Sequence, residues 1–249
     1  MEGKAEMNVS GPKIYYTIPI LGGIPITETI VNMWILMAVI VAICFFLTRG
    51  LKERPVKKRQ VVAELIVSKL YGLVEDTMGE RNTGYAPFIG TLMTISAVGS
   101  LSSLVGMRPI TADLSVTLAW GIVIFLIVQT VSIKTTGILA YLKSFFQPVA
   151  LLFPLNIIST ISTPVSMAFR HFGNIASGLV ISKLVYSALA SLSAAVLAFI
   201  PNDFISSIPI FQVGIPAVLS IYFDLFSSGL QAYIFCMLSM VYIANANEP

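Results

Sequence analysis

The stretch that decides the fold is residues 156–200, NIISTISTPVSMAFRHFGNIASGLVISKLVYSALASLSAAVLAFI, which is almost continuously apolar. As one helix it would measure about 68 Å at 1.5 Å per residue, roughly twice what a perpendicular membrane crossing needs. A second apolar run, 217–246, would be about 45 Å long, and Pro201-Asn202-Asp203 separates the two runs. We therefore expect residues 156–249 to form a long, strongly tilted, near-horizontal helical hairpin in the membrane.

The composition of the whole chain agrees with a membrane location. Of its 249 residues, 56% are hydrophobic and 11% are charged, whereas soluble domains carry about 25% charged residues. One water-soluble domain of this length cannot bury so much apolar surface. The composition excludes an ordinary cytosolic enzyme and a disordered chain. It predicts an all-α integral membrane protein of about five to six helices.

Upstream of the hairpin, the sequence predicts three ordinary spans within a single membrane domain, residues 1–249. Its parts are an external N-terminal segment (1–25), a first span (26–48), a basic and amphipathic cytoplasmic segment (49–85), two spans (86–137) and an interfacial connection (138–155). Six positive charges between Arg49 and Arg59 directly follow the first span, and such a cluster marks the cytoplasmic side. We expect the N-terminus outside and the C-terminus inside.

Residues 60–77 have a different pattern from the spans. Their apolar positions recur at helical spacing, with four charged residues between them. This pattern predicts an amphipathic helix that lies on the inner membrane surface or packs against a partner.

Arg170 is the most informative residue, because it places a fixed charge inside the first apolar run. A charge at membrane depth costs roughly 2.5–3.5 kcal/mol and faces a cavity or a partner. An arginine stays protonated, so it presents a positive charge to a carboxylate instead of relaying a proton. At 100° per residue, several polar side chains share its helix face: Ser159, Thr163, Ser166, Asn174 and Ser177. The alternative is an arginine that snorkels or ties two helices together.

The second apolar run carries a matching polar set. Asp224 and Gln231 are spaced to share one face, with Ser228 between them. A buried carboxylate can hold a proton or a sodium ion; the alternative is an Asp224 that pairs with Arg170 or Lys183. Gln231 has a donor and an acceptor with which to reach Arg170 across the hairpin. His171 either titrates or serves in packing.

Two segments resemble subunit a of bacterial-type F-type ATP synthases. Pro164-Val-Ser-Met-Ala-Phe-Arg170-His-Phe-Gly-Asn174-Ile-Ala-Ser-Gly178 is similar to that family's arginine segment. Asp224-Leu-Phe-Ser-Ser-Gly-Leu-Gln231-Ala-Tyr-Ile-Phe is similar to its last-helix segment. The resemblance extends in order from about residue 26 to residue 245.

The resemblance implies a stator subunit with two offset half-channels for H⁺ or Na⁺ against a rotating ring of c subunits. Arg170 would be the essential ion-translocation residue, facing the c-subunit carboxylate. The ion pathway would comprise Asp224, Gln231, Asn174, Ser177, Ser228 and His171. The implied partners are the c ring, b-type peripheral stalk subunits, other ATP synthase subunits and membrane lipid. The implied location is the bacterial plasma (inner) membrane, in a multi-pass arrangement. We expect no catalytic chemistry in this chain itself, no cofactor, no metal and no nucleic acid.

The chain departs from the family pattern at four positions. Leu179, Asn156 and Thr160 stand where the family often has acids, and His171 replaces the usual leucine. These departures leave the half-channel entries and the choice between H⁺ and Na⁺ open. The competing hypothesis is a secondary ion transporter or antiporter with an Arg/Asp centre. Such a transporter would have repeated halves, which the sequence lacks.

Overall fold

The computed structural model describes residues 12–19, 23–52, 57–197, 210–212 and 214–247. Apart from one small β-hairpin, the regular structure in these ranges is helical, which confirms the predicted all-α class. The elements, in chain order, are β1 (Ile14–Ile18), β2 (Ile24–Thr27), α1 (Glu28–Thr48), α2 (Lys58–Met78), η1 (Glu80–Tyr85), α3 (Ala86–Leu101), η2 (Ser102–Val105), η3 (Ile110–Ala112), α4 (Leu114–Thr136), α5 (Ile138–Ser144), η4 (Ala150–Leu152), α6 (Phe153–Leu197), η5 (Ile210–Gln212), α8 (Ile215–Ser220), η6 (Ile221–Ser227) and α9 (Ser228–Ala246).

Five helical segments in the described part of the chain are long and apolar enough to cross a membrane. They are Glu28–Thr48, Glu80–Val105, Leu114–Thr136, Ala150–Leu197 and Val218–Ala246. The placement of these helices in a bilayer and the division of the chain into spans stay predictions. The predicted break at Pro201-Asn202-Asp203 and the first residues of the external segment lie outside the described residues.

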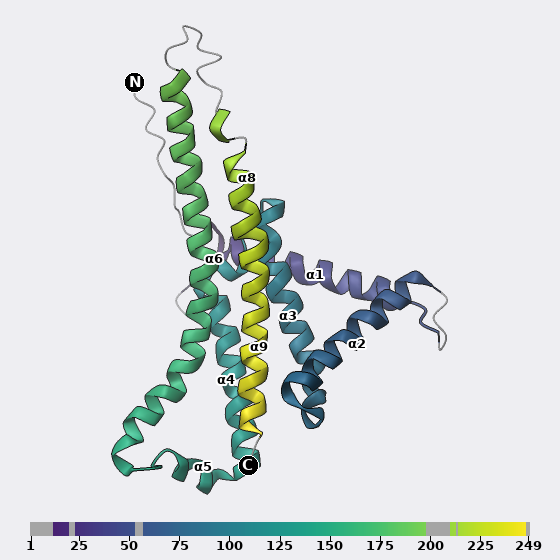
Figure 1. Ribbon diagram of the computed structural model, residues 1–249, viewed down its shortest axis with the longest axis vertical. Helices are drawn as coiled ribbons and strands as arrows, with labels where there is room; N and C mark the ends of the chain where they lie inside the picture. Colours follow the sequence, from purple (N-terminus) through teal and green to yellow (C-terminus); the bar gives the residue numbers. More distant parts are fainter. Residues whose placement is uncertain (1–11, 20–22, 53–56, 198–209, 213, 248–249) are drawn as a thin grey trace.

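Most of the long helices run roughly in one direction, whereas α1 runs across it and α2 runs obliquely (Figure 1). α6 and the continuous run from α8 to α9 lie side by side, with α3 and α4 packed along them. α1 runs across the direction of α9, and α5 lies across the lower end of the bundle as drawn. The predicted long hairpin is therefore present as two adjacent helical arms, and α1 crosses the direction of these arms.

Close approach of α4 to α6 depends on Gly121. A Cβ placed at Gly121 would lie 2.8 Å from the backbone oxygen of Pro164 and 3.5 Å from the Cβ of Ala168. Small residues let helix backbones approach closely in this way. This contact holds the part of α6 that precedes Arg170 against the bundle.

Two apolar clusters form the core. One joins α2, α3 and α9 through Val74, Met78, Ala86, Ile89, Met240 and Ile243. The other joins α3, α4, α6 and α9 through Leu92, Ile124, Met167, Phe235 and Cys236. The predicted amphipathic helix is present as α2. Its C-terminal half packs into the first cluster, whereas Val61, Leu65 and Ile66 near its start are exposed.

The end of α9 is held by a polar contact at the first cluster. Asn247 Nδ2 donates to Asn82 Oδ1 at 2.6 Å, and Thr135 Oγ1 donates to Asn247 Oδ1 at 3.2 Å. Asn82 in turn donates to the backbone oxygen of Met78 at 2.7 Å. The network ties the end of α9 to η1, to the end of α2 and to α4.

Candidate functional site

Arg170 lies on the outward face of α6 and is exposed. Its neighbours along that face, Ser166 and Ser177, are exposed as well. Within the described ranges, Arg170 makes no ion pair with any carboxylate of the chain. A permanent charge on an exposed helix face cannot rest against lipid hydrocarbon, so this face must meet water or another protein.

The hydroxyl groups beside Arg170 donate their protons to their own helix. Ser177 Oγ donates to the backbone oxygen of Asn174 at 3.1 Å, and Thr163 Oγ1 donates to that of Ser159 at 3.1 Å. Each oxygen keeps lone pairs that can accept a hydrogen bond. The face can therefore accept hydrogen bonds from water or from a protonated ligand.

Asn174 connects the two arms of the hairpin. Ser227 Oγ donates to Asn174 Oδ1 at 3.1 Å, and Asn174 Nδ2 donates to the backbone oxygen of Ser227 at 3.4 Å. Nearby, a Cβ at Gly178 would contact Phe223 at 3.5 Å. One turn beyond Arg170, the second arm thus lies directly against α6.

Asp224 sits in η6, a π-helical turn within an otherwise α-helical arm. Its carboxylate Oδ2 accepts a hydrogen bond from Ser220 Oγ at 2.6 Å, and the side chain is half-buried. In the described residues it forms no ion pair with Arg170 or Lys183, so the alternative of a structural ion pair is not observed. π turns occur frequently at functional sites.

Ser228 and Gln231 face the interior of the bundle. Ser228 is 3% exposed and donates to the backbone oxygen of Phe223 at 3.1 Å. Gln231 is 6% exposed. No hydrogen bond joins Gln231 to Arg170 among the described residues, so the bond that Gln231 could make across the hairpin is not observed. The contact between Asn174 and Ser227 bridges the arms instead.

His171 points away from Arg170, into the bundle, and is fully buried. Its ring meets Phe235 at 5.1 Å and Trp120 at 6.0 Å between centroids, both edge to face. Nε2 lies 3.5 Å from Ser96 Oγ, and Nδ1 has no partner within the described residues. These contacts favour the packing role that the sequence left open beside a titrating one.

A polar cavity of about 470 Å³ opens where α4, α5, α6 and α9 meet. Its polar lining includes Gln129, Ser132, Tyr141, Asn156, Ser159, Thr160 and Asn245. Tyr141 donates from its hydroxyl to Gln129 Oε1, and burial raises the pKa of Tyr141. Asn156 Nδ2 donates to the backbone oxygens of Phe145 and Gln147 at 2.8 and 3.0 Å. The bonds of Asn156 hold the connection after α5 against the start of α6.

The polar groups lie on both sides of Arg170 along α6. Ser159, at the cavity, is about 17 Å of helix before Arg170, and Asn174 is about 6 Å after it. Asp224 and Ser227 lie near Asn174, because Asn174 contacts Ser227 directly. The fixed positive charge therefore stands between two separate polar regions.

Sequence reasoning missed three features of this region. These are the π turn around Asp224, the cavity between α4, α5, α6 and α9, and a buried pair in which Ser100 Oγ and Thr111 Oγ1 lie 2.9 Å apart. The polar residues Gln129 and Asn156 inside apolar stretches were a signal for the cavity. No local pattern indicates the π turn.

Comparison with known proteins finds a matching family model and relatives that carry the same name. The family model described as ATP synthase A chain matches residues 30–244. The chain is 34% identical to ATP synthase subunit a of Moorella thermoacetica, over 90% of this chain and 93% of that protein. It is 35% identical to ATP synthase subunit a 1 of Crocosphaera subtropica, over 89% and 87%. It is 29% identical to the sodium ion specific ATP synthase subunit a of Propionigenium modestum, over 94% and 84%.

Proposed function

Because the chain belongs to the ATP synthase A chain family, we propose that it acts as the ion-translocating stator subunit of the complex, with Arg170 facing the carboxylates of a rotating c ring. The single observation that carries this proposal is the position of Arg170. It is a fixed charge on the outward, exposed face of an apolar helix and has no counter-ion among the described residues. A carboxylate on another subunit supplies the missing counter-charge.

The chemistry at Arg170 follows from its permanent charge. An arginine next to a carboxyl group lowers that group's pKa by about 1–3 units. A ring carboxyl that arrives protonated beside Arg170 therefore releases its proton into the adjoining polar region, and a carboxylate that carries Na⁺ releases the ion there for the same electrostatic reason. The same charge repels free cations, which prevents direct flow between the two polar regions.

The two polar regions supply the two offset half-channels. On one side, the cavity around Asn156 and Ser159 gives ions access to the start of the polar face of α6. On the other side lie Asn174 and Asp224 with the remaining predicted pathway residues, Ser177, Ser228, Gln231 and His171. Asp224, half-buried and hydrogen-bonded to Ser220, is placed to take up the ion there. His171 contributes as a packed, buried neighbour of this region.

The arrangement of the helices supports the proposed orientation. If α1 crosses the bilayer close to its normal, the hairpin arms lie close to the membrane plane, because α1 runs across them (Figure 1). A near-horizontal hairpin presents a long outward face to a curved ring. The basic segment after α1 supports a cytoplasmic position for that end of the helix, with the N-terminus outside a bacterial plasma membrane. The b-type stalk subunits complete the stator in this proposal.

The test is coupled ATP synthesis in vesicles that contain the complex with Arg170→Ala. We expect the complex to assemble with its ring and coupled synthesis to be abolished, because no fixed charge then makes the ring carboxyl release its ion. Lys183→Gln is the matched control: it removes an exposed charge from the same helix outside the polar face and should retain synthesis. Normal coupled synthesis in Arg170→Ala would overturn the proposal.

A further inference from the structure

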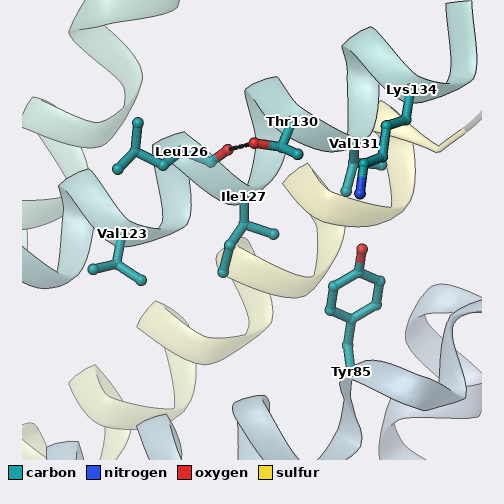
Figure 2. Close-up of a pocket in the computed structure, with 7 residues that line it drawn as sticks. All are labelled: Tyr85, Val123, Leu126, Ile127, Thr130, Val131 and Lys134. Carbon is teal, nitrogen blue, oxygen red and sulfur yellow. Dashed lines mark hydrogen bonds between the residues drawn. The ribbon is translucent and has the colours of Figure 1, made fainter.

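A groove of about 380 Å³ lies between η1 and α4, on a part of the bundle that the proposed ion path does not use. It is lined by Tyr85, Val123, Leu126, Ile127, Thr130, Val131 and Lys134. Figure 2 shows Tyr85 rising from one side and Lys134 descending from the other, so that the hydroxyl and the ammonium group point toward one another. The remaining wall is formed mainly by branched apolar side chains of α4.

The polar and apolar parts of the groove are separated along α4. Val123 and Leu126 are 45% and 57% exposed and form the apolar part. Thr130 donates its hydroxyl proton to the backbone oxygen of Leu126 at 2.7 Å, so this proton is already used. The free donors therefore gather at one end, at Tyr85 and Lys134.

The charge at that end is uncompensated. Within the described ranges, Lys134 pairs with no carboxylate, and it is exposed. The helix from Val123 to Lys134 spans about 17 Å, close to the depth of one leaflet of a hydrocarbon core of about 30 Å. The groove therefore has its charged end and its apolar end about 17 Å apart along α4, which suits an amphiphilic ligand with a charged headgroup and an apolar chain.

We propose that this groove is a binding site for an anionic phospholipid. The phosphate accepts hydrogen bonds from the Lys134 ammonium and the Tyr85 hydroxyl, and an acyl chain lies against Val123, Leu126 and Ile127. Basic pockets beside membrane helices bind anionic headgroups in this way. Free phosphate would use only the polar end of the groove and would leave its apolar part without a ligand. The proposal does not depend on the role of Arg170.

The test uses the assembled complex in its native membrane, with an apolar photoreactive diazirine residue in place of Leu126. Ile122 carries the same label in a parallel sample, because it is exposed on the same helix but does not line the groove. Light-induced adducts are identified by mass spectrometry. We expect the ratio of anionic to zwitterionic lipid adducts at residue 126 to be about five times that at residue 122, as one basic contact predicts.

Two charge variants distinguish lipid binding in this groove from general contact with membrane lipid. Lys134→Gln should bring the ratio at residue 126 down to that at residue 122, whereas Lys143→Gln, an exposed lysine outside the groove, should leave it raised. Equal ratios at the two positions in the unmodified chain would overturn the proposal. Adducts to a protein subunit at residue 126 would show a partner helix instead. Loss of the enrichment on adding inorganic phosphate would show a site for the free ion, and either result also overturns the proposal.

Discussion

Replacing Gly121 with valine should separate α4 from α6 beside the segment that carries Arg170. The Cβ of the new side chain would lie 2.8 Å from the backbone oxygen of Pro164. A backbone oxygen cannot turn aside as a flexible side chain can. One of the two helices must therefore shift, and α6 carries Arg170 less than two turns further on.

The magnitude follows from a comparison with Gly173→Val. A Cβ at Gly173 meets nothing within 4 Å, and both substitutions change helix propensity by the same amount, so that contribution cancels. What remains is the overpacking at Gly121, which typically costs 1–3 kcal/mol. We expect Gly121→Val to be less stable than Gly173→Val by about 2 kcal/mol, or roughly thirtyfold in the folding equilibrium.

The assay is equilibrium unfolding of the purified chain in detergent, followed by the fluorescence of Trp120 in a Trp34→Phe background. Trp120 is next to Gly121 and contacts His171 and Phe235 by its ring, so its emission reports on this packing. Equal stability of the two valine variants would refute the reasoning, because it would mean that α4 and α6 do not depend on the contact at Gly121.

Three further predictions concern contacts outside the helix pair. Asn247→Ala removes two hydrogen bonds and should cost about 1–3 kcal/mol, measured as faster amide hydrogen exchange at the end of α9; unchanged exchange would show that the network is dispensable. Asp113→Ala removes the N-cap of α4, where Asp113 Oδ1 accepts a hydrogen bond from the Ser115 amide at 3.0 Å. Thermal unfolding should show a loss of about 1 kcal/mol in the free energy of unfolding, whereas Asp113→Asn should retain most of the stability. Burial raises the pKa of Tyr141 above 10.0, so its contribution to stability is fully present below pH 10 and is lost as the pH rises through the raised pKa. An alkaline ultraviolet titration should show a late phenolate step that Tyr141→Phe removes, and a step at the ordinary phenol pKa would contradict this.

The sequence by itself determined which segments are helical, and it singled out Arg170 as the candidate functional residue. The length of the apolar runs predicted the hairpin, because the rise per residue makes each run too long for an ordinary crossing. The scarcity of charges made Arg170 stand out, because burying an unpaired charge is costly. Both inferences depend on the local sequence pattern and on the free-energy cost of moving a charge from water into the membrane. Neither requires knowledge of the tertiary contacts.

The tertiary structure decided which way the side chains face. Arg170 and His171 are adjacent in sequence, yet α6 turns one outward and buries the other against Trp120 and Phe235. The bond from Ser227 to Asn174 joins residues 53 positions apart, and the π turn at Asp224 changes the phase that a regular helix predicts. Such features depend on how distant segments fit together, and single-sequence periodicity carries no information on that fit.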